Sequence, residues 1–288
     1  MAVRPRRSVL YMPATNAKAV DKAKLLPCDA VILDCEDAVA PDAKLAAREA
    51  AAAAVRAGGF GDREVIIRVN GLDTEWGEQD LVVAAGAAPD AILVPKVNGP
   101  EDVERYHKAI VGAPETTRLW AMIETARSLF ALDAIAEAAP STRLECFVMG
   151  TNDLAKEMRW RQTPGREPFA AALSMAVAAA RTSGLTVLDG VYNGIEDDAG
   201  FEAVCEQGVD FGMDGKTLIH PRQIDICNRA FSPSADEVAF ARAVIAAFAL
   251  PENGGKGVIR VEGRMAELLH LAQAERTVAV ADAIAARA

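Results

Sequence analysis

The 288-residue sequence predicts an α/β protein, a (β/α)8 TIM barrel followed by a C-terminal helical extension. Eight short apolar or β-branched segments alternate with longer stretches of helical periodicity, which is typical of a parallel sheet. The length also suits one barrel, because a typical barrel needs about 250 residues. A doubly wound open sheet is the alternative fold. No Gly-x-Gly-x-x-Gly motif follows the first strand, which weakens the dinucleotide-binding form of that alternative.

Each predicted strand is a short run of branched, apolar residues, and the eighth is the weakest. In chain order, the strands are Ser8–Pro13, Ala30–Asp37, Glu64–Asn70, Ala91–Val97, Leu119–Thr125, Cys146–Thr151, Leu185–Val191 and Phe211–Met213. Between them, apolar residues recur every three or four positions, as on one face of a helix. These helices are expected at Asn16–Leu26, Asp42–Arg56, Pro100–Ile110, Ala126–Glu137, Phe169–Arg181 and Asp197–Glu206.

The pattern changes after the eighth strand. Residues 1–230 form the predicted catalytic barrel, and residues 231–288 form the predicted extension. The extension exceeds what a barrel needs, so we expect it to act as a lid that packs on the barrel or on a neighbouring subunit. Its predicted elements are a helix at Ser234–Ala249, a glycine-rich turn, a strand at Val258–Val261 and a long helix at Met265–Ala286.

Composition excludes several classes of protein. The chain has 31 basic and 41 acidic residues, a net charge of −10, which argues against a general nucleic-acid binder. No segment reaches the roughly 18 apolar residues of a membrane span, and the N-terminal apolar run is too short for a signal peptide. The five cysteines are widely spaced with no Cys-x-x-Cys pair, as expected for free thiols. We therefore expect a cytoplasmic protein.

Carboxylates follow several strands at the end of the barrel where functional side chains gather. Glu36 lies at the end of strand two and Glu124 at the end of strand five, and Asp153 comes just after strand six. Some acids there, such as Asp37, have the alternative role of capping the next helix. Several carboxylates on one face repel one another unless a cation lies among them. Glu124 and Asp153 lie on adjacent strands, and such oxygen donors suit Mg²⁺, whereas the three scattered histidines do not predict a zinc or iron site.

Basic residues accompany these carboxylates. Strand alternation puts Arg68 and Asn70 on the same side of strand three, so both are expected to reach the mouth of the barrel. Tyr11 lies near the end of strand one. Lys18 and Lys22 are four residues apart on the following helix and share a face. That face is either a solvated surface or a site for a phosphate-bearing group.

Motifs on every predicted strand except the eighth, and beyond it, resemble one known family. Together they are similar to the citrate lyase beta-subunit-like, HpcH/HpaI aldolase superfamily, especially its malyl-CoA and citramalyl-CoA lyase branch. The resemblance spans nearly the whole chain. The motifs are Arg7–Pro13, Leu33–Val39, Ala46–Arg48, Ile67–Asn70, Val94–Lys96, Ile123–Thr125, Met149–Leu154, Asp189–Gly190, Gly215–Lys216, Ile219–Gln223 and Phe231–Pro233.

The resemblance implies a β/α barrel, usually a homotrimer or larger, that binds Mg²⁺ and a CoA thioester. Glu124 and Asp153 match the metal ligands of the family. Arg68 matches the arginine that binds the substrate carboxylate and stabilises the enolate. Glu36 matches an acid that orients metal-bound water.

Further positions match substrate contacts of the family. Tyr11, Lys18 and Lys22 match residues that contact the CoA portion. The backbone that would cradle a 2-oxo acid is formed by Gly150, Thr151, Asn152 and Asp153.

The resemblance thus implies a Mg²⁺-dependent lyase that cleaves a 3-hydroxyacyl-CoA into a 2-oxo acid and a short acyl-CoA by retro-Claisen chemistry. One position departs from the family, because Glu267 stands where the lyase branch carries an acid/base aspartate. Glu267 is either that acid/base or an acidic residue in the first turn of the last helix, where its charge interacts favourably with the helix dipole. The alternatives are a malyl-CoA thioesterase, a CoA-independent 2-oxo-acid aldolase and a catalytically silent barrel.

Overall fold

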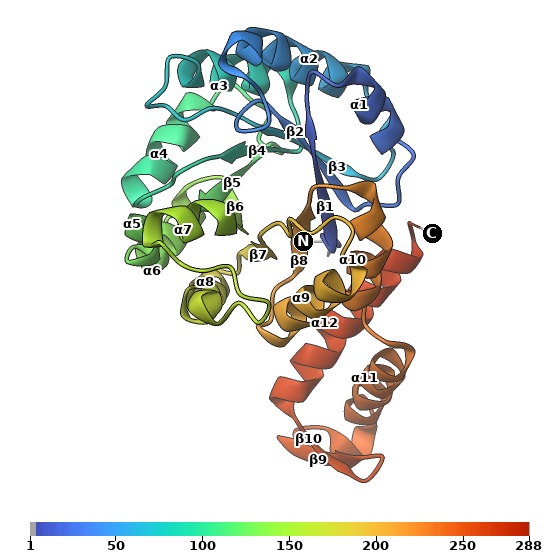
Figure 1. The fold of residues 1–288 in the computed structure, drawn as a ribbon. Coiled ribbons are helices and arrows are strands. Elements are labelled where there is room, and N and C mark those ends of the chain that lie inside the picture. The colour runs from blue at the N-terminus through green and yellow to red at the C-terminus, as the bar shows by residue number, and fades with distance from the viewer. Residues whose placement is uncertain (1–3, 288) are drawn as a thin grey trace. The chain divides into compact units, whose positions relative to one another are not determined.

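The computed structural model describes residues 4–287 and contains a closed barrel of eight parallel strands in chain order (Figure 1). Each strand pairs with the next, and β8 closes the barrel by pairing with β1. The predicted (β/α)8 barrel is confirmed. Its strands are β1 (Ser8–Pro13), β2 (Ala30–Asp34), β3 (Glu64–Arg68), β4 (Ala91–Val94), β5 (Arg118–Ile123), β6 (Leu144–Met149), β7 (Thr186–Asp189) and β8 (Gly215–Leu218).

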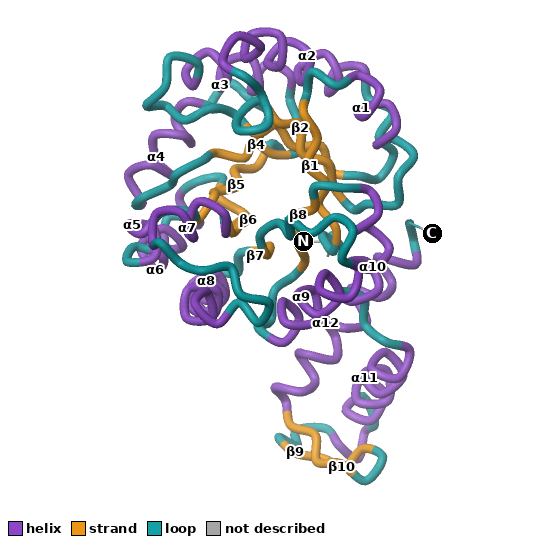
Figure 2. Tube along the Cα trace, in the orientation of Figure 1, coloured by secondary structure: helices purple, strands orange, loops and turns teal. Residues whose placement is uncertain are grey.

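Helices surround the strands as an outer ring (Figure 2). Three of them, α3, α7 and α10, lie outside the helical stretches singled out from the sequence. The barrel helices are α1 (Ala17–Ala23), α2 (Lys44–Ala57), α3 (Gly77–Ala87), α4 (Pro100–Ala109), α5 (Ala126–Leu129), α6 (Leu132–Glu137), α7 (Thr151–Met158), α8 (Ala170–Thr182), α9 (Asp198–Asp210) and α10 (Ile224–Ala230).

Strand residues face two apolar layers because side chains alternate along a strand. One set, which includes Ile32, Ile66 and Trp120, fills the inside of the barrel. The other set, which includes Leu33 and Ile67, packs between the strands and the helices. Because both faces are buried, the strands are nearly continuous apolar runs.

A buried arginine closes the end of the barrel where the strands begin. Arg6 donates to both carboxylate oxygens of Glu64, at 2.6 and 2.7 Å, and to Glu145 at 2.6 Å. Its guanidinium also lies 5.0 Å from the centroid of the Trp120 ring. Trp120 and these ion pairs fill the inside of the barrel at this end, whereas the functional side chains of such barrels lie at the opposite end.

The described chain divides into two compact units, residues 6–231 and a smaller unit of residues 4–5 with 232–287. The smaller unit contains α11 (Ala235–Phe248), an antiparallel hairpin of β9 (Val258–Val261) and β10 (Arg264–Glu267), and α12 (Leu268–Ala285). It has its own apolar core, in which Val244 and Ile259 are buried. No helix within residues 4–287 combines the length and apolar character that crossing a bilayer requires.

The predicted eighth strand is wrong. Phe211–Met213 follow α9 as a turn, with Gly212 in the left-handed region at a φ of 83°. The strand lies just beyond it, at Gly215–Leu218. Its central residues Lys216 and Thr217 are polar yet buried, so its apolar pattern is too weak to predict a strand.

The start of the last helix is also wrong. Met265–Glu267 belong to β10, which pairs with β9, and α12 begins only at Leu268. Gly263, at a φ of 81°, lies in the turn between the two strands. Hairpins need left-handed residues in their turns, and such a glycine is the sequence signal for this one.

Candidate active site

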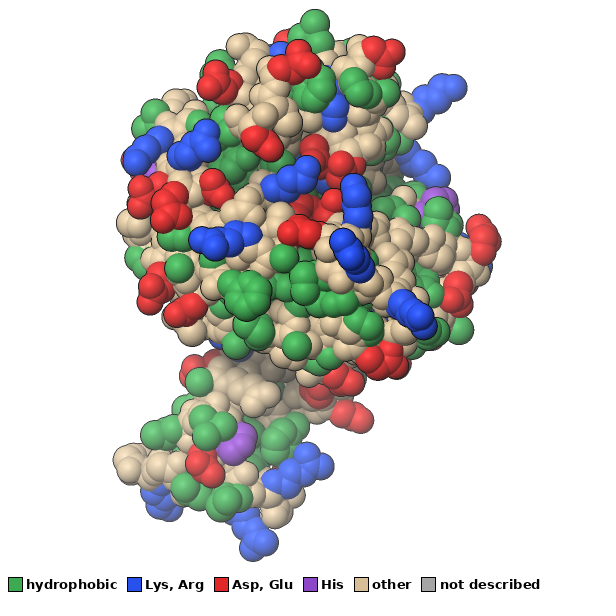
Figure 3. All heavy atoms as spheres, turned by 60° about the vertical axis from the view of Figure 1, so that its left-hand side comes forward, with side chains coloured by type: hydrophobic (Ala, Val, Ile, Leu, Met, Phe, Trp, Pro, Cys, Tyr) green, Lys and Arg blue, Asp and Glu red, His purple; other side chains and the backbone are tan. Residues whose placement is uncertain are grey.

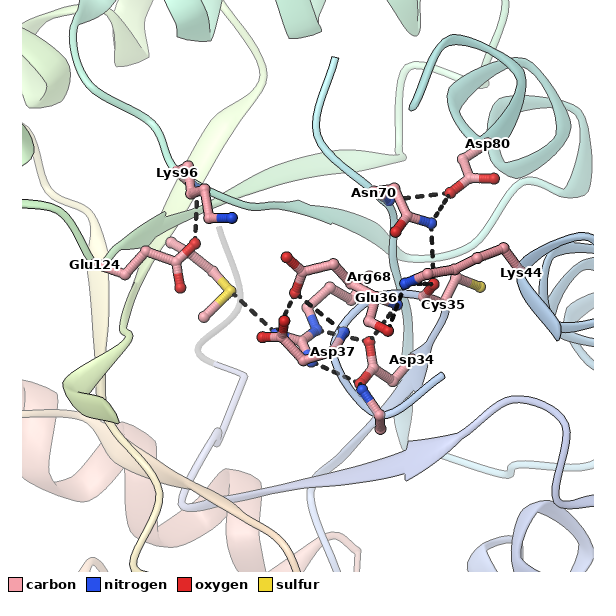
Figure 4. Close-up of polar contacts among 12 residues, drawn as sticks. Asp34, Cys35, Glu36, Asp37, Lys44, Arg68, Asn70, Asp80, Lys96 and Glu124 are labelled. Atoms are coloured by element: carbon pink, nitrogen blue, oxygen red, sulfur yellow. Dashed lines mark hydrogen bonds and ion pairs between the residues drawn. The ribbon is translucent and has the colours of Figure 1, made fainter. Parts of the chain in front are cut away.

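Charged side chains from separate strands meet at the end of the barrel where the strands finish (Figure 4). Arg68 is the last residue of β3, and the strand register pairs it with Asp34, the last residue of β2. Glu36 follows β2, and Glu124 follows β5. On the face presented in Figure 3, acidic and basic side chains gather around a recessed centre. The fold therefore brings these strand ends together, as the sequence predicts.

The Arg68 guanidinium makes most of the polar contacts at this mouth. Its Nε and Nη2 donate to the two carboxylate oxygens of Asp34, at 2.7 and 2.6 Å. Its Nη1 lies 2.7 Å from Glu36 and 3.2 Å from Asp37. The guanidinium also lies 4.9 Å from the centroid of the Tyr11 ring. A bidentate pair of this kind fixes both the position and the plane of the guanidinium.

Two residues that support the mouth are absent from the predicted site. The buried Asp34 carboxylate accepts the backbone amide of Glu36 at 2.9 Å in addition to the guanidinium of Arg68. The buried Lys44 ammonium donates to the carbonyl oxygen of Glu36 at 2.7 Å. Together they fix the turn that carries Glu36. The sequence signal was available, since Asp34 and Arg68 are opposite charges at the ends of neighbouring strands.

The pKa of Glu36 lies above that of an ordinary carboxyl group. Burial raises the pKa of Glu36 to about 8, and the nearby carboxylates of Asp37 and Glu124 add to the shift, while Arg68 opposes it. A carboxyl group that is neutral for much of the time at neutral pH can both accept and return a proton. A carboxyl group in this environment is suited to acid/base chemistry.

Glu124 and Asp153, called here the Glu124–Asp153 pair, lie close enough for the charge of Asp153 to act on Glu124. One oxygen of the Glu124 carboxylate accepts the backbone amide of Lys96 at 2.7 Å. Burial raises the pKa of Glu124 to about 7, and the negative charge of Asp153, in the first turn of α7, adds to that shift. A Cβ atom on Gly150 would lie 2.3 Å from the Cβ of Glu124, so only glycine lets α7 begin this close.

This pair is the part of the mouth that can hold a cation. Within residues 4–287, no three histidine, cysteine, aspartate or glutamate side chains form a group that could hold a metal. Two carboxylates with open remaining positions nevertheless suit a cation that keeps several waters.

Of the three predicted CoA contacts, Tyr11 lies at the mouth. The Tyr11 ring lies against Arg68, and its buried hydroxyl has no hydrogen-bond partner within the described residues. Lys18 and Lys22 are exposed on α1. Their exposure leaves both ammonium groups accessible to a ligand.

Asn70 does not reach the mouth, contrary to the prediction. Its side-chain amide donates to the carbonyl oxygen of Cys35 at 2.9 Å and to Asp80 of α3 at 2.6 Å. Strand β3 ends at Arg68, so the alternation that placed Asn70 beside it no longer applies. Asn70 instead ties the end of β3 to α3.

The residues that follow Gly150 lie at the start of α7. Thr151 is buried, and Asn152 is exposed and accepts a hydrogen bond from Asn193 at 2.9 Å. Glu267 belongs to the smaller unit, where it is the N-cap residue of α12. Its backbone amide donates to Nδ1 of His270 at 2.9 Å, which is one half of a capping box.

Comparison with known proteins agrees with this architecture. Residues 7–221 match the model of the HpcH/HpaI aldolase/citrate lyase family. A (3S)-malyl-CoA thioesterase of Cereibacter sphaeroides is 49% identical over 282 residues, which cover 98% of this chain and 96% of that protein. The citrate lyase subunit beta of Escherichia coli is 34% identical over 271 residues, covering 92% and 89% of the two chains.

A solved structure also matches along the chain. The protein CitE from Mycobacterium tuberculosis, in complex with magnesium, acetoacetate and coenzyme A, has a TM-score of 0.78 and 27% sequence identity. The match covers 98% of this chain and 100% of that one. The chain described here belongs to the HpcH/HpaI aldolase/citrate lyase family.

Proposed function

We propose that the protein hydrolyses the thioester of a malyl-CoA-type 3-hydroxyacyl-CoA, in a Mg²⁺-dependent reaction at the mouth of the barrel. The observation that carries this proposal is the 49% identity, over 98% of the chain, with a (3S)-malyl-CoA thioesterase. Hydrolysis was the alternative to carbon–carbon cleavage on the sequence alone. Glu267, in the place of the aspartate of the lyase branch, also favours it.

The residues at the mouth fit a bound Mg²⁺. Glu124 and Asp153 supply two hard oxygen donors, and burial together with the charge of Asp153 raises the pKa of Glu124. Arg68 is paired with Asp34 and Glu36, and its charge only partly offsets the rise in the pKa of Glu124. Glu124 and Asp153 would hold the ion, which when bound supplies Lewis-acid polarisation of substrate oxygens.

The protein's own groups account for the remaining steps. Arg68, held in plane by Asp34, stabilises the negative charge that develops on the thioester oxygen. Glu36 takes a proton from the attacking water, whose oxygen bonds to the thioester carbon. The C–S bond then breaks, and the departing CoA thiolate receives the proton from Glu36. The products are a hydroxy acid and free CoA, so atoms and charge balance.

Other residues take the substrate's remaining parts. We assign Tyr11, Lys18 and Lys22 to the CoA portion, since exposed ammonium groups and a phenol ring suit phosphates and an adenine or pantetheine group. The backbone of residues 150–153, at the start of α7, suits the carboxylate of the acid, because helix N-termini favour anions. We further propose that the C-terminal unit, with Glu267, reaches a neighbouring copy in a homotrimer or larger assembly.

Carbon–carbon cleavage is the second candidate. The retained set of Arg68, Glu124 and Asp153 matches the lyase branch, and a citrate lyase subunit beta is 34% identical. In that reaction Arg68 would stabilise the enolate of the acyl-CoA, and Glu267 would return a proton to its carbon. The two reactions would use the same residues at the mouth, and they differ in whether water attacks the thioester carbon.

Product analysis separates the two candidates. The purified protein is given (3S)-malyl-CoA and MgCl2, and free thiol, glyoxylate and acetyl-CoA are quantified together. Equal amounts of free CoA and malate, without glyoxylate, are expected. Glyoxylate and acetyl-CoA in equal amounts would establish cleavage instead, and no Mg²⁺-dependent product of either kind would contradict both.

A further inference from the structure

A cavity of about 370 Å³ lies beside the mouth in the barrel unit. Its walls come from the loop between α7 and α8, the loop between β7 and α9, and parts of α7 and α9 themselves. One part of the lining is apolar, from Phe169, Val191 and Val204, and another part carries the side-chain amides of Asn152 and Asn193. Cavities of this size and mixed lining are typical of small-molecule sites in proteins.

The charged side chains in this lining are satisfied by the protein itself. They are Arg166 and Asp197. Arg166 donates from Nη1 to both oxygens of Asp189, at 2.8 Å each. Asp197 accepts the hydroxyl of Tyr192 at 2.6 Å and the amide of Gly200 at 3.0 Å. The cavity therefore offers apolar surface and neutral amides, which select an uncharged ligand group.

The walls of the cavity are held in place before any ligand arrives. Asp189, at the end of β7, is buried and also accepts the Lys216 ammonium at 2.7 Å. Arg166 extends this ion cluster to the loop between α7 and α8, and it also donates to Gln207 of α9 at 2.7 Å. Gln207 in turn donates to the carbonyl oxygen of Gly165 at 2.6 Å. A preformed cavity spares the ligand the cost of ordering its own site.

The cavity adjoins the proposed catalytic residues. Thr151 and Asn152 line it, and the next residue is Asp153. The Asn152 side-chain oxygen accepts from Gln162 of one loop at 3.2 Å and from Asn193 of the other at 2.9 Å. These amides form the polar part of the lining. A group bound there is therefore next to a substrate held by the Glu124–Asp153 pair.

We propose that this cavity is a subsite for an uncharged, mainly apolar chain of the CoA thioester, an inference that rests on the proposed function. Two parts of such a substrate have this chemistry. One is an alkyl branch on the hydroxyacyl group, and the other is the pantetheine arm, which joins methylene and methyl groups to neutral amides. The anionic parts of the substrate are excluded, because the cavity has no unpaired basic group among its lining residues.

The test places a larger side chain in the cavity, at an exposed position where the substitution should not disturb the fold. Ala203 is an exposed residue of α9 that lines the cavity, and Ala203→Leu adds a branched side chain to it. Ala199→Leu makes the same change on an exposed position of the same helix that is not part of the lining, so it is the matched control. The milder Ala203→Val replaces Ala203→Leu if melting curves show that the latter does not fold.

Three thioesters identify the occupant: (3S)-malyl-CoA, its methyl-branched analogue and the malyl thioester of N-acetylcysteamine. Ala203→Leu should raise KM by about tenfold for the substrate that uses the cavity, while kcat and the control stay at parental values. A rise confined to the branched ester assigns the cavity to the alkyl branch. An equal rise for both CoA esters, absent for the N-acetylcysteamine thioester, assigns it to pantetheine.

Parental KM values of Ala203→Leu for all three thioesters would overturn the subsite. Absence of turnover by the parent protein would contradict the proposed function instead. In that case calorimetric binding of CoA decides the subsite alone. Weaker binding to Ala203→Leu than to Ala199→Leu and the parent supports it, and equal binding by all three proteins overturns it.

Discussion

Replacing Asp189 with asparagine removes the negative centre of the ion cluster behind β7. In the native protein the buried carboxylate faces two cations, with Lys216 at 2.7 Å and Arg166 at 2.8 Å. Burial alone would raise the pKa of Asp189, but these two cations outweigh it and hold that pKa below its ordinary value. The ionised form is therefore the stable one, and asparagine keeps the shape while losing the charge.

The expected loss of stability follows from what the substitution leaves behind. The Lys216 ammonium is fully buried, so it would stay in the interior without its counter-ion. Removing one partner of such a buried pair typically costs about 3–5 kcal/mol. For a domain of this size, about 4 kcal/mol corresponds to a fall in melting temperature of roughly 8 °C.

Differential scanning calorimetry at neutral pH measures this fall. Asp21→Asn is the control, because it removes an exposed carboxylate that pairs with Lys24 and should leave the melting temperature within about 1 °C of the parent. Asp189→Asn combined with Lys216→Met removes a stranded cation, so this double variant should melt above the single one. If Asp189→Asn melts within about 3 °C of the parent, the electrostatic reasoning is refuted. It is also refuted if the double variant melts at a lower temperature than Asp189→Asn.

Four further outcomes are expected. Arg68→Lys keeps the charge but loses the planar fork, so turnover should fall by about tenfold or more, and a near-parental rate in a steady-state assay would exclude the assigned role. Glu124→Gln and Asp153→Asn should each reduce turnover to the level that the parent shows in excess chelator, with unchanged circular dichroism; parental activity of both would remove the metal from the mechanism. Because burial raises the pKa of Glu124 to about 7 and that of Glu36 to about 8, both above the ordinary carboxyl value, the metal-free protein should lose stability as the pH rises from about 4.5 to 8; a melting temperature that rises over this range would contradict the shifts. Glu267→Gln should keep CoA-ester binding, and any carbon–carbon cleavage measured for the parent should be lost from this variant and kept by Glu267→Asp; parental cleavage by Glu267→Gln would leave this residue only its capping role.

The sequence predicts the barrel because seven of its strands are apolar on both faces, a pattern that hydropathy detects directly. The eighth escapes because Lys216 is a charged residue whose burial is stabilised by Asp189, a residue on a different strand. A hydropathy pattern scores each residue separately, so it does not detect that a charged residue is buried because it pairs with a residue distant in the sequence. The hairpin of β9 and β10 escapes for a related reason, since it depends on pairing between segments and not on either segment alone.

The sequence predicts where a side chain lies when its place at a strand end determines its position, and it does not when the position depends on local contacts. Arg68, Glu36 and Glu124 meet because strand ends of a parallel barrel share one face. The direction of Asn70 depends on where β3 stops, and the sequence pattern does not fix that residue. The amide of Lys96 likewise reaches Glu124 only through its backbone conformation, which its side chain does not reveal.

That conformation at Lys96 has a consequence for engineering the protein. The residue has a φ of 50°, in the left-handed region, where a non-glycine residue costs about 1–2 kcal/mol. Glycine would adopt the same conformation without that strain. Selection for heat resistance alone would thus favour glycine at this position, yet a freer backbone would hold the carboxylate of Glu124 less firmly. The strained backbone at Lys96 therefore lowers the stability of the fold while it keeps Glu124 in a fixed position.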